Sequence, residues 1–220
     1  MPLSTTDKQT VFVVDDDEQM RDSLRVLLEM LGFHVNAFGT PASFLRFYRS
    51  EMRGCLLLDI RMPRQSGLEL YEQLLGEGKR IPVIFITAHA DVSTAVAAMK
   101  TGAIEFLEKP FERATLLERV EKALALDAEW RQSDAEFTSL AERIARLNPR
   151  DRDTLRLIEA GLTNKAMAGR LQLTERAVEM RRSAIMRKLR VRTMAELIEL
   201  TATHRVLADL RRATADRVDR

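Results

Sequence analysis

Residues 11–17 read Val-Phe-Val-Val-Asp-Asp-Asp, and residues 55–59 read Cys-Leu-Leu-Leu-Asp. Each segment is a short apolar run that ends in acid, which predicts a buried strand followed by a polar loop. Similar runs and intervening amphipathic stretches alternate along the first half of the chain. Strands are expected at 11–14, 34–38, 55–58, 82–86 and 104–107, and helices at about 18–31, 41–49, 66–76, 91–101 and 112–125. This alternation predicts an α/β, doubly wound, five-stranded parallel sheet within residues 1–126.

A helical linker is expected at 127–146, because residues 126–146 contain neither Pro nor Gly. One apolar stripe runs along it at spacings of three and four: Phe137, Leu140, Ile144 and Leu147. Asn148-Pro149 then fits an N-cap followed by Pro at the first helical position. An all-α, four-helix domain is therefore predicted at 147–207.

Four helices are expected in this second domain, at about 149–160, 164–171, 174–190 and 193–207. Gly161 is expected to close the first of them. The last segment, 208–220, is rich in Arg and Asp and is expected to be a charged tail that frays.

The charge of the chain differs between its halves. Residues 1–130 carry 15 Lys and Arg against 20 Asp and Glu, a net of −5, and residues 131–220 carry 20 against 13, a net of +7. Within 174–192 there are seven basic residues and two acidic ones. This density suits a polyanion such as nucleic acid, although a solvated helix face fits the charge equally well.

The sequence predicts a cytoplasmic protein with no membrane contact. No apolar run approaches the ~20 residues that a membrane helix needs, and the first residues lack the basic and apolar blocks of a secretory signal. The single cysteine, Cys55, lies in an apolar run and is expected to be a buried structural thiol.

Carboxylates at two strand ends are the strongest chemical signal. The carboxyl ends of strands at the switch point of a doubly wound sheet form its ligand crevice, so Asp15, Asp16 and Asp59 are expected to converge. Three such carboxylates need a cation, and hard oxygen ligands suit Mg²⁺. Thr87 and Lys109 also lie at strand ends on this edge. A carboxylate nucleophile, a metal, a lysine and a hydroxyl together predict a phosphoryl-transfer site.

Four motifs occur in the order and spacing typical of a response-regulator receiver: V-V-D-D, L-L-L-D-I-R-M-P with a following S-G, I-T-A, and F-L-E-K-P-F. The chain resembles that family over 8–126. The resemblance implies that Asp59 accepts a phosphoryl group from a sensor histidine kinase, with Mg²⁺ as cofactor. Asp16 and Asp59 would bind Mg²⁺ directly, Asp15 would act through water, and the backbone carbonyl of Arg61 would complete the site.

The resemblance also implies roles on the phosphoryl side of the site. Thr87 and Lys109 would contact the phosphoryl oxygens, and the peptide bond between Lys109 and Pro110 would be cis. Phe106 matches the aromatic residue that moves with Thr87 on activation.

Several of these residues also have simpler interpretations. Asp17 and Glu18 fit the first turn of a helix, where acidic side chains are favourable, and Phe106 alone fits a core aromatic residue. The enzymatic alternative is an aspartyl-phosphate hydrolase, which would carry a second acid two residues after its nucleophile. That position is Arg61, which argues against a hydrolase.

The predicted helix 174–190 has the pattern of a DNA-binding helix, with Thr174 as its N-cap. Val178, Ile185 and Leu189 share one face, which is expected to be core. Basic and polar side chains lie roughly opposite: Arg176, Met180, Ser183 and Arg187. A helix of this kind, preceded by a short helix and a tight turn at Gln172, suits insertion into the major groove.

The run from Asn148 to Leu189 resembles the LuxR-type tetrahelical domain, over roughly 147–205. With the receiver in front, the chain resembles FixJ/NarL-type transcriptional regulators. The resemblance places base contacts at Glu179, Met180 and Ser183, and phosphate contacts at Asn164, Lys165, Arg182, Arg187 and Lys188. Ala177 stands where the family usually has Thr, which removes one phosphate contact, and Arg181, where the family usually has His, can replace it.

Together these features predict a phosphorylation-controlled transcriptional regulator that is not an enzyme. The expected partners are a sensor histidine kinase, duplex DNA, RNA polymerase and a second copy of the chain, because phosphorylation is expected to promote dimerisation. An RNA-binding antiterminator is an alternative, but it would lack the short helix, turn and basic helix at 164–190. An enzymatic output is disfavoured, because the second half has no Gly-rich phosphate loop or metal-ligand cluster and only one His, His204.

Overall fold

The structure is a computed structural model that describes residues 9–88 and 102–218, and its contacts divide the chain into two compact units, Met1–Arg131 and Gln132–Arg220. The first unit contains a five-stranded sheet in the order β2-β1-β3-β4-β5, with all neighbouring strands parallel. Its strands are β1 (Thr10–Val14), β2 (His34–Phe38), β3 (Gly54–Asp59), β4 (Val83–Thr87) and β5 (Glu105–Glu108). The predicted parallel sheet is confirmed.

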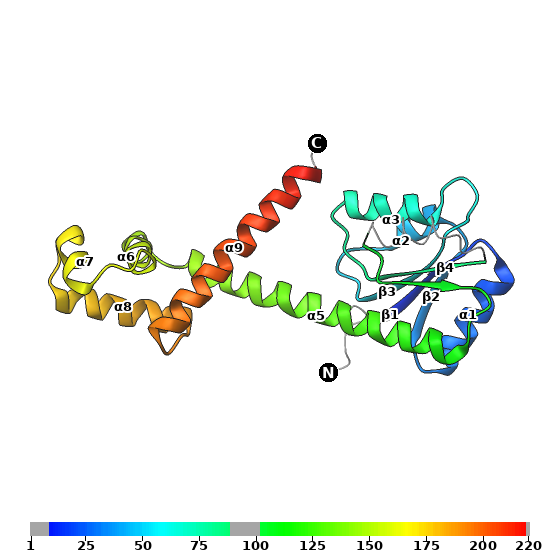
Figure 1. The fold of residues 1–220 in the computed structure, drawn as a ribbon, viewed down its shortest axis with the longest axis horizontal. Helices are drawn as coiled ribbons and strands as arrows, with labels where there is room; N and C mark the ends of the chain where they lie inside the picture. Colours follow the sequence, from blue (N-terminus) through cyan, green and yellow to red (C-terminus); the bar gives the residue numbers. More distant parts are fainter. Residues whose placement is uncertain (1–8, 89–101, 219–220) are drawn as a thin grey trace. The chain divides into compact units, whose positions relative to one another are not determined.

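Helices cover both faces of this sheet (Figure 1). They are α1 (Glu18–Met30), α2 (Pro41–Phe47), α3 (Gly67–Gly76) and the first part of α5 (Arg113–Ala145). Alternate residues of β1 point to opposite faces, so Phe12 packs on the side of α2 and α3, while Val13 packs on the side of α1 and α5. The helix expected at 91–101 lies outside the described residues.

The strand register aligns the carboxyl ends of the central strands. Val14 pairs with Leu58, and Asp59 pairs with Ile86. The last residues of β1, β3, β4 and β5, and the residues directly after them, therefore meet at one edge of the sheet. This is the edge at which ligands bind in a doubly wound sheet, at the point where the strand order reverses.

Helix α5 is longer than the sequence pattern suggested. The expected helix 112–125 and linker 127–146 form one continuous helix of 33 residues. The chain offers no helix-breaking Pro or Gly between Pro110 and Pro149. Asp127, in the range expected to be linker, accepts a hydrogen bond from the backbone N–H of Gly54 at 3.0 Å. Contacts of the first unit thus continue beyond residue 126.

The second unit is all-α, as predicted. Its helices are α6 (Pro149–Glu159), α7 (Asn164–Leu171), α8 (Glu175–Leu189) and α9 (Met194–Val218), together with the end of α5. Asn148 and Thr174 cap α6 and α8 through their side-chain oxygens, which confirms both expected caps. The expectation that the chain leaves the last helix at 207 is wrong, because residues 208–218 contain no Gly or Pro to end it.

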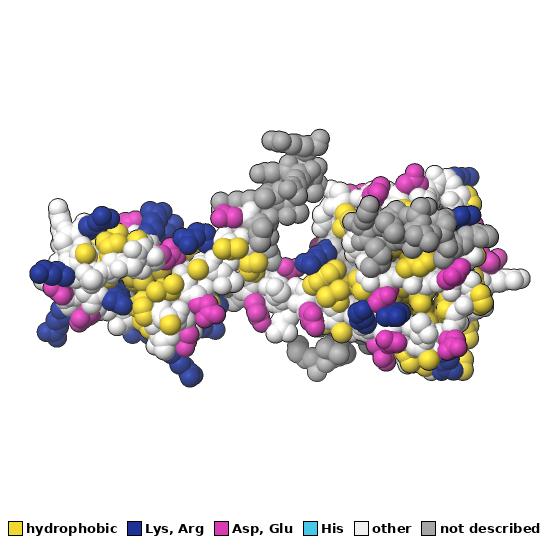
Figure 2. Space-filling model, in the orientation of Figure 1, with side chains coloured by type: hydrophobic (Ala, Val, Ile, Leu, Met, Phe, Trp, Pro, Cys, Tyr) yellow, Lys and Arg dark blue, Asp and Glu magenta, His cyan; other side chains and the backbone are white. Residues whose placement is uncertain are grey.

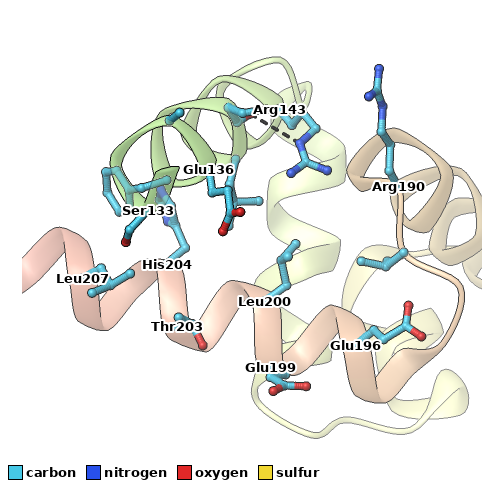
Figure 3. A pocket seen from close by; sticks show the side chains of 15 residues that line it. Ser133, Glu136, Arg143, Arg190, Glu196, Glu199, Leu200, Thr203, His204 and Leu207 are labelled. Carbon is cyan, nitrogen blue, oxygen red and sulfur yellow. Dashed lines mark hydrogen bonds between the residues drawn. The ribbon is translucent and has the colours of Figure 1, made fainter. Parts of the chain in front are cut away.

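The end of α5 packs on α9 within this unit. The ring of Phe137 stacks on that of His204, with centroids 5.0 Å apart. Beside them lies an open groove of about 860 Å³ between the two helices (Figure 3), lined by apolar side chains such as Leu200 and by charged ones such as Glu136. Arg143, on the wall of the groove, donates a hydrogen bond to the carbonyl of Leu189 at 2.8 Å. No described helix is long and apolar enough to cross a membrane.

Candidate functional site

Three charged side chains meet at the carboxyl edge of the sheet. The Nζ atom of Lys109 lies 2.8 Å from Oδ2 of Asp15 and 2.8 Å from Oδ1 of Asp59, so one ammonium bridges two carboxylates. Asp15 and Asp59 are only 2% and 6% exposed. The backbone N–H of Lys109 also donates to the carbonyl of Thr87 at 2.7 Å, which ties the residue after β5 to the end of β4.

The backbone around Asp59 is arranged to hold its side chain in place. The N–H of Arg61 donates to Oδ2 of Asp59 at 2.7 Å. Gly67, the first residue of α3, lies against the carbonyl of Asp59, and a Cβ atom at this glycine would be 2.2 Å from that oxygen. Glycine at 67 therefore lets α3 begin directly over the acidic residue.

Asp15 is fixed by the start of α1. Its Oδ1 atom accepts a hydrogen bond from the N–H of Asp17 at 2.9 Å, while Asp17 itself caps α1 by accepting from Gln19 and Met20. Glu18 is an acid of the first turn of α1, as expected, whereas Asp17 lies one residue earlier and is the N-cap of this helix.

The electrostatics of the site follow from two buried carboxylates sharing one cation. Burial raises the pKa of Asp59, with opposition from the hydrogen bond and charge of Lys109 and a further raising contribution from Asp15. Burial acts to lower the pKa of Lys109, but hydrogen bonds and charges from both carboxylates outweigh it, so the net shift is upward. Lys109 is therefore held as the ammonium, and Asp59 resists ionisation more than a free carboxyl does.

Of the three carboxylates expected to converge, Asp15 and Asp59 share the ammonium of Lys109. Asp16 follows Asp15 in the loop after β1 and is exposed. Within 9–88 and 102–218, no three His, Cys, Asp or Glu side chains are gathered as a metal-binding group. Thr87 is buried at the end of β4. Phe106 of β5 is partly buried and packs against the apolar core on the α2 and α3 side of the sheet. The peptide bond between Lys109 and Pro110 is cis, as expected.

Helix α8 has the two faces that its sequence predicted. Val178, Ile185 and Leu189 are fully buried in the core of the second unit. A shallow hollow on the other side of the helix is lined by Arg176, Glu179, Met180, Ser183, Ala184 and Arg187. Met180 is 68% exposed there. Figure 2 shows Lys and Arg side chains distributed around the helices of this unit.

Several of the predicted DNA contacts are also joined by hydrogen bonds to other helices of the domain. Arg182 of α8 donates to the side-chain oxygen of Asn164 at the start of α7. Lys188 donates to the carboxylate of Asp151, which is buried at the first turn of α6. No local pattern predicts the pairing of Lys188 with Asp151, because the two residues are 37 positions apart.

Two family profiles match the chain. The profile of the response regulator receiver domain matches residues 11–121, and that of the bacterial regulatory proteins of the luxR family matches residues 145–201. The chain belongs to the response-regulator family. This response regulator carries a LuxR-type DNA-binding domain and is therefore a transcription regulator of a two-component system.

Relatives cover nearly the whole response regulator. It is 37% identical over 204 residues to the transcriptional regulatory protein FixJ of Bradyrhizobium diazoefficiens, which spans 93% of this chain and 100% of the relative. It is 39% identical over 196 residues to nodulation protein W of the same organism, spanning 89% of this chain and 86% of the relative. Among solved structures, the response regulator StyR is similar with a TM-score of 0.80 and 47% identity, covering 89% of this chain and 99% of that one.

Proposed function

We propose that Asp59 accepts a phosphoryl group from a sensor histidine kinase and that this modification controls the binding of α8 to promoter DNA. The main support is the bridge from Lys109 to Asp15 and Asp59 at the carboxyl edge of the sheet. A buried carboxylate at this edge can attack phosphorus, and an adjacent ammonium can bind the negative oxygens that arrive with it.

The transfer has a simple balance of bonds. An oxygen of Asp59 forms the new bond to phosphorus, and the bond from phosphorus to the kinase histidine breaks, so that its electron pair returns to the imidazole. Lys109 exchanges its contact with Asp59 for a phosphoryl oxygen. Thr87, at the end of β4, donates its hydroxyl to another one.

The residues at this edge fit Mg²⁺, because carboxylate and carbonyl oxygens are its preferred ligands. Two of the carboxylates already hold one cationic group, the ammonium of Lys109. Asp16, Asp59 and the carbonyl of Arg61 would hold the metal directly, and Asp15 would act through water. Bound Mg²⁺ supplies positive charge that stabilises the phosphoryl oxygens during transfer.

The output of the switch is proposed to be dimerisation and DNA binding. The Thr87–Phe106 pair would be the two-state element, which the phosphoryl group biases by making additional contacts in one state. The pairing surface is proposed near 91–112, of which 91–101 lies outside the described residues. RNA polymerase is the proposed recipient of the signal at the promoter.

Phosphorylation is expected to change both association and DNA affinity. A small phosphodonor with Mg²⁺ should tighten the self-association of the full chain, measured by sedimentation, and its binding to a promoter duplex identified by genomic footprinting. Hairpin RNA of similar length serves as the control polyanion and should bind weakly. An unchanged association constant and unchanged duplex affinity would contradict the proposal, and preferential RNA binding would favour an antiterminator.

The exposed face of α8 is proposed to read the major groove, where base contacts specify sequence and phosphate contacts position the protein. Glu179, Met180 and Ser183 are assigned to bases. The phosphate contacts are assigned to basic and polar side chains around them: Asn164, Lys165, Arg176, Arg181, Arg182, Arg187 and Lys188.

Substitutions in these two classes are expected to act differently. Arg187→Ala should weaken binding about equally on all sequences and flatten the salt dependence by about one unit. Glu179→Ala and Ser183→Ala should instead change base preference, by ~1–3 kcal/mol per lost base contact, without changing the salt slope. Affinities for the promoter and a scrambled duplex across a salt series provide the measurement.

Arg187 is a better probe than Lys188 in this experiment. Lys188→Ala also leaves the buried carboxylate of Asp151 without its ammonium partner, so its effect combines lost DNA contact with lost stability. If Arg187→Ala and Glu179→Ala lose the same affinity, and lose it equally on the promoter and on the scrambled duplex, α8 does not lie in the major groove as proposed.

A further inference from the structure

Arg21 of α1 reaches back over the acidic loop that follows β1. Its Nη1 atom donates to the carbonyl of Asp15 at 2.8 Å and lies 3.4 Å from the carbonyl of Asp16. Its backbone N–H donates to the carbonyl of Asp17 at 2.9 Å. One residue of the helix therefore contacts three successive peptide units of the loop that carries two proposed metal ligands.

A slot at the end of the neighbouring strand accommodates the guanidinium. Gly39 directly follows β2, and a Cβ atom placed on it would lie 3.2 Å from Nη1 of Arg21. Gly39 does not have the left-handed φ that favours glycine. The side chain that glycine lacks would instead crowd the guanidinium, so glycine is suited to this position by space.

The contacts of Arg21 leave the carboxylates available. Both side-chain contacts come from Nη1, which carries two N–H groups and can therefore donate to two successive carbonyl groups. By binding the carbonyl oxygens of Asp15 and Asp16, Arg21 fixes the peptide units without occupying their carboxylate oxygens. Its positive charge also offsets the mutual repulsion of four consecutive acidic residues, 15–18.

We propose that Arg21 is a positioning residue of the phosphoryl-transfer site, which holds the β1–α1 loop in the conformation that binds Mg²⁺. This inference rests on the proposed function. Residues that orient metal ligands typically contribute 10–100-fold to metal affinity. Arg21 acts through the backbone and does not touch the phosphoryl group.

The test compares Arg21→Gln with a matched control on the same helix. Arg25 forms an exposed ion pair with Asp22 at 3.1 Å, one turn further along α1. Calorimetric titration of the unphosphorylated full chain with MgCl₂ should show affinity about ten-fold weaker for Arg21→Gln and unchanged for Arg25→Gln. The Mg²⁺ concentration that gives half-maximal phosphorylation by a small phosphodonor should rise in parallel, with less change in the rate at saturating Mg²⁺.

Arg21→Lys keeps the charge but replaces the planar guanidinium by a compact ammonium on a different stem, so its Mg²⁺ affinity should lie between those of wild type and Arg21→Gln. It also decides the question if Arg21→Gln does not fold. Wild-type Mg²⁺ affinity in the folded Arg21 variants would overturn the assignment while leaving the proposed function intact. A wild-type chain that neither binds Mg²⁺ nor accepts a phosphoryl group would instead overturn the proposed function, and this inference with it.

Discussion

Asp59→Asn is expected to abolish phosphoryl transfer to the chain. The substitution keeps the shape of the side chain but replaces the nucleophilic carboxylate by an amide, which cannot form the acyl phosphate. Lys109 loses one of its two anionic partners and keeps Asp15. Intact-mass measurement after incubation with a small phosphodonor and Mg²⁺ should show one added phosphoryl group on the wild-type chain and none on the variant.

The fold of Asp59→Asn should survive, so that the loss can be assigned to chemistry. The folded-state pKa of Asp59 is raised above its usual value. The protonated form of Asp59 is therefore favoured by folding. This contribution to the free energy of unfolding is fully present below the pKa that Asp59 has in the unfolded chain, and it is lost as pH rises through the higher pKa that Asp59 has in the folded chain. Asparagine carries no charge to bury, so the variant should unfold at a urea concentration equal to or above that of the wild type at neutral pH.

An exposed acid on α1 provides the matched control for this experiment. Asp22 is in the same unit, and Asp22→Asn should be phosphorylated like the wild type. The acyl phosphate on the wild-type chain should be base-labile. Label that persists on Asp59→Asn would mean that another residue is the acceptor.

Arg131→Ala is expected to be strongly destabilising, by about 3–5 kcal/mol, because it leaves a buried charge without its partner. The carboxylate of Asp127 is buried and accepts from Nε of Arg131 at 2.9 and 3.1 Å. Arg131 also donates to the carbonyls of Ser50 and Met52 at the turn before β3. The loss is large compared with the ~5–15 kcal/mol that stabilises a typical domain.

Trp130 makes this loss measurable in the full chain. It is the single tryptophan, and the guanidinium of Arg80 lies 3.8 Å from its ring centroid. Urea unfolding followed by its fluorescence should therefore report the first unit. Arg25→Ala is the control, because the ion pair of Arg25 with Asp22 lies in the same unit, is exposed and should contribute roughly 0.5 kcal/mol or less.

The pH dependence provides an independent check on the mechanism. Burial raises the pKa of Asp127, and the charge of Arg131 opposes that rise. Removal of Arg131 should raise the pKa of Asp127 further. Once Asp127 is protonated, the folded variant no longer contains a buried charge without a partner, so this cost in stability disappears. The stability gap between wild type and variant should be widest at neutral pH and narrow as pH falls through the raised pKa. A gap that does not change with pH would point to lost packing instead of an unpaired carboxylate.

Much of the fold was determined by local features of the sequence. The apolar runs that end in acid placed β1 and β3, and Asn148 and Thr174 marked the starts of α6 and α8. The spacing of Val178, Ile185 and Leu189 identified the buried face of α8. These features are encoded in side-chain period and in hydrogen bonds between residues a few positions apart, so the order of residues is sufficient to show them.

Only the tertiary structure decided which charges share a site. Lys109 lies 94 positions from Asp15, Asp127 lies 73 from Gly54, and Lys188 lies 37 from Asp151. Each pairing depends on strand register and helix packing, which no local pattern records. The side chain of Asp16 turns to solvent while that of its neighbour Asp15 is buried, although both follow the same strand. Burial makes a charge without a partner costly, so the folded chain, and not the motif, selects the ammonium that each carboxylate binds.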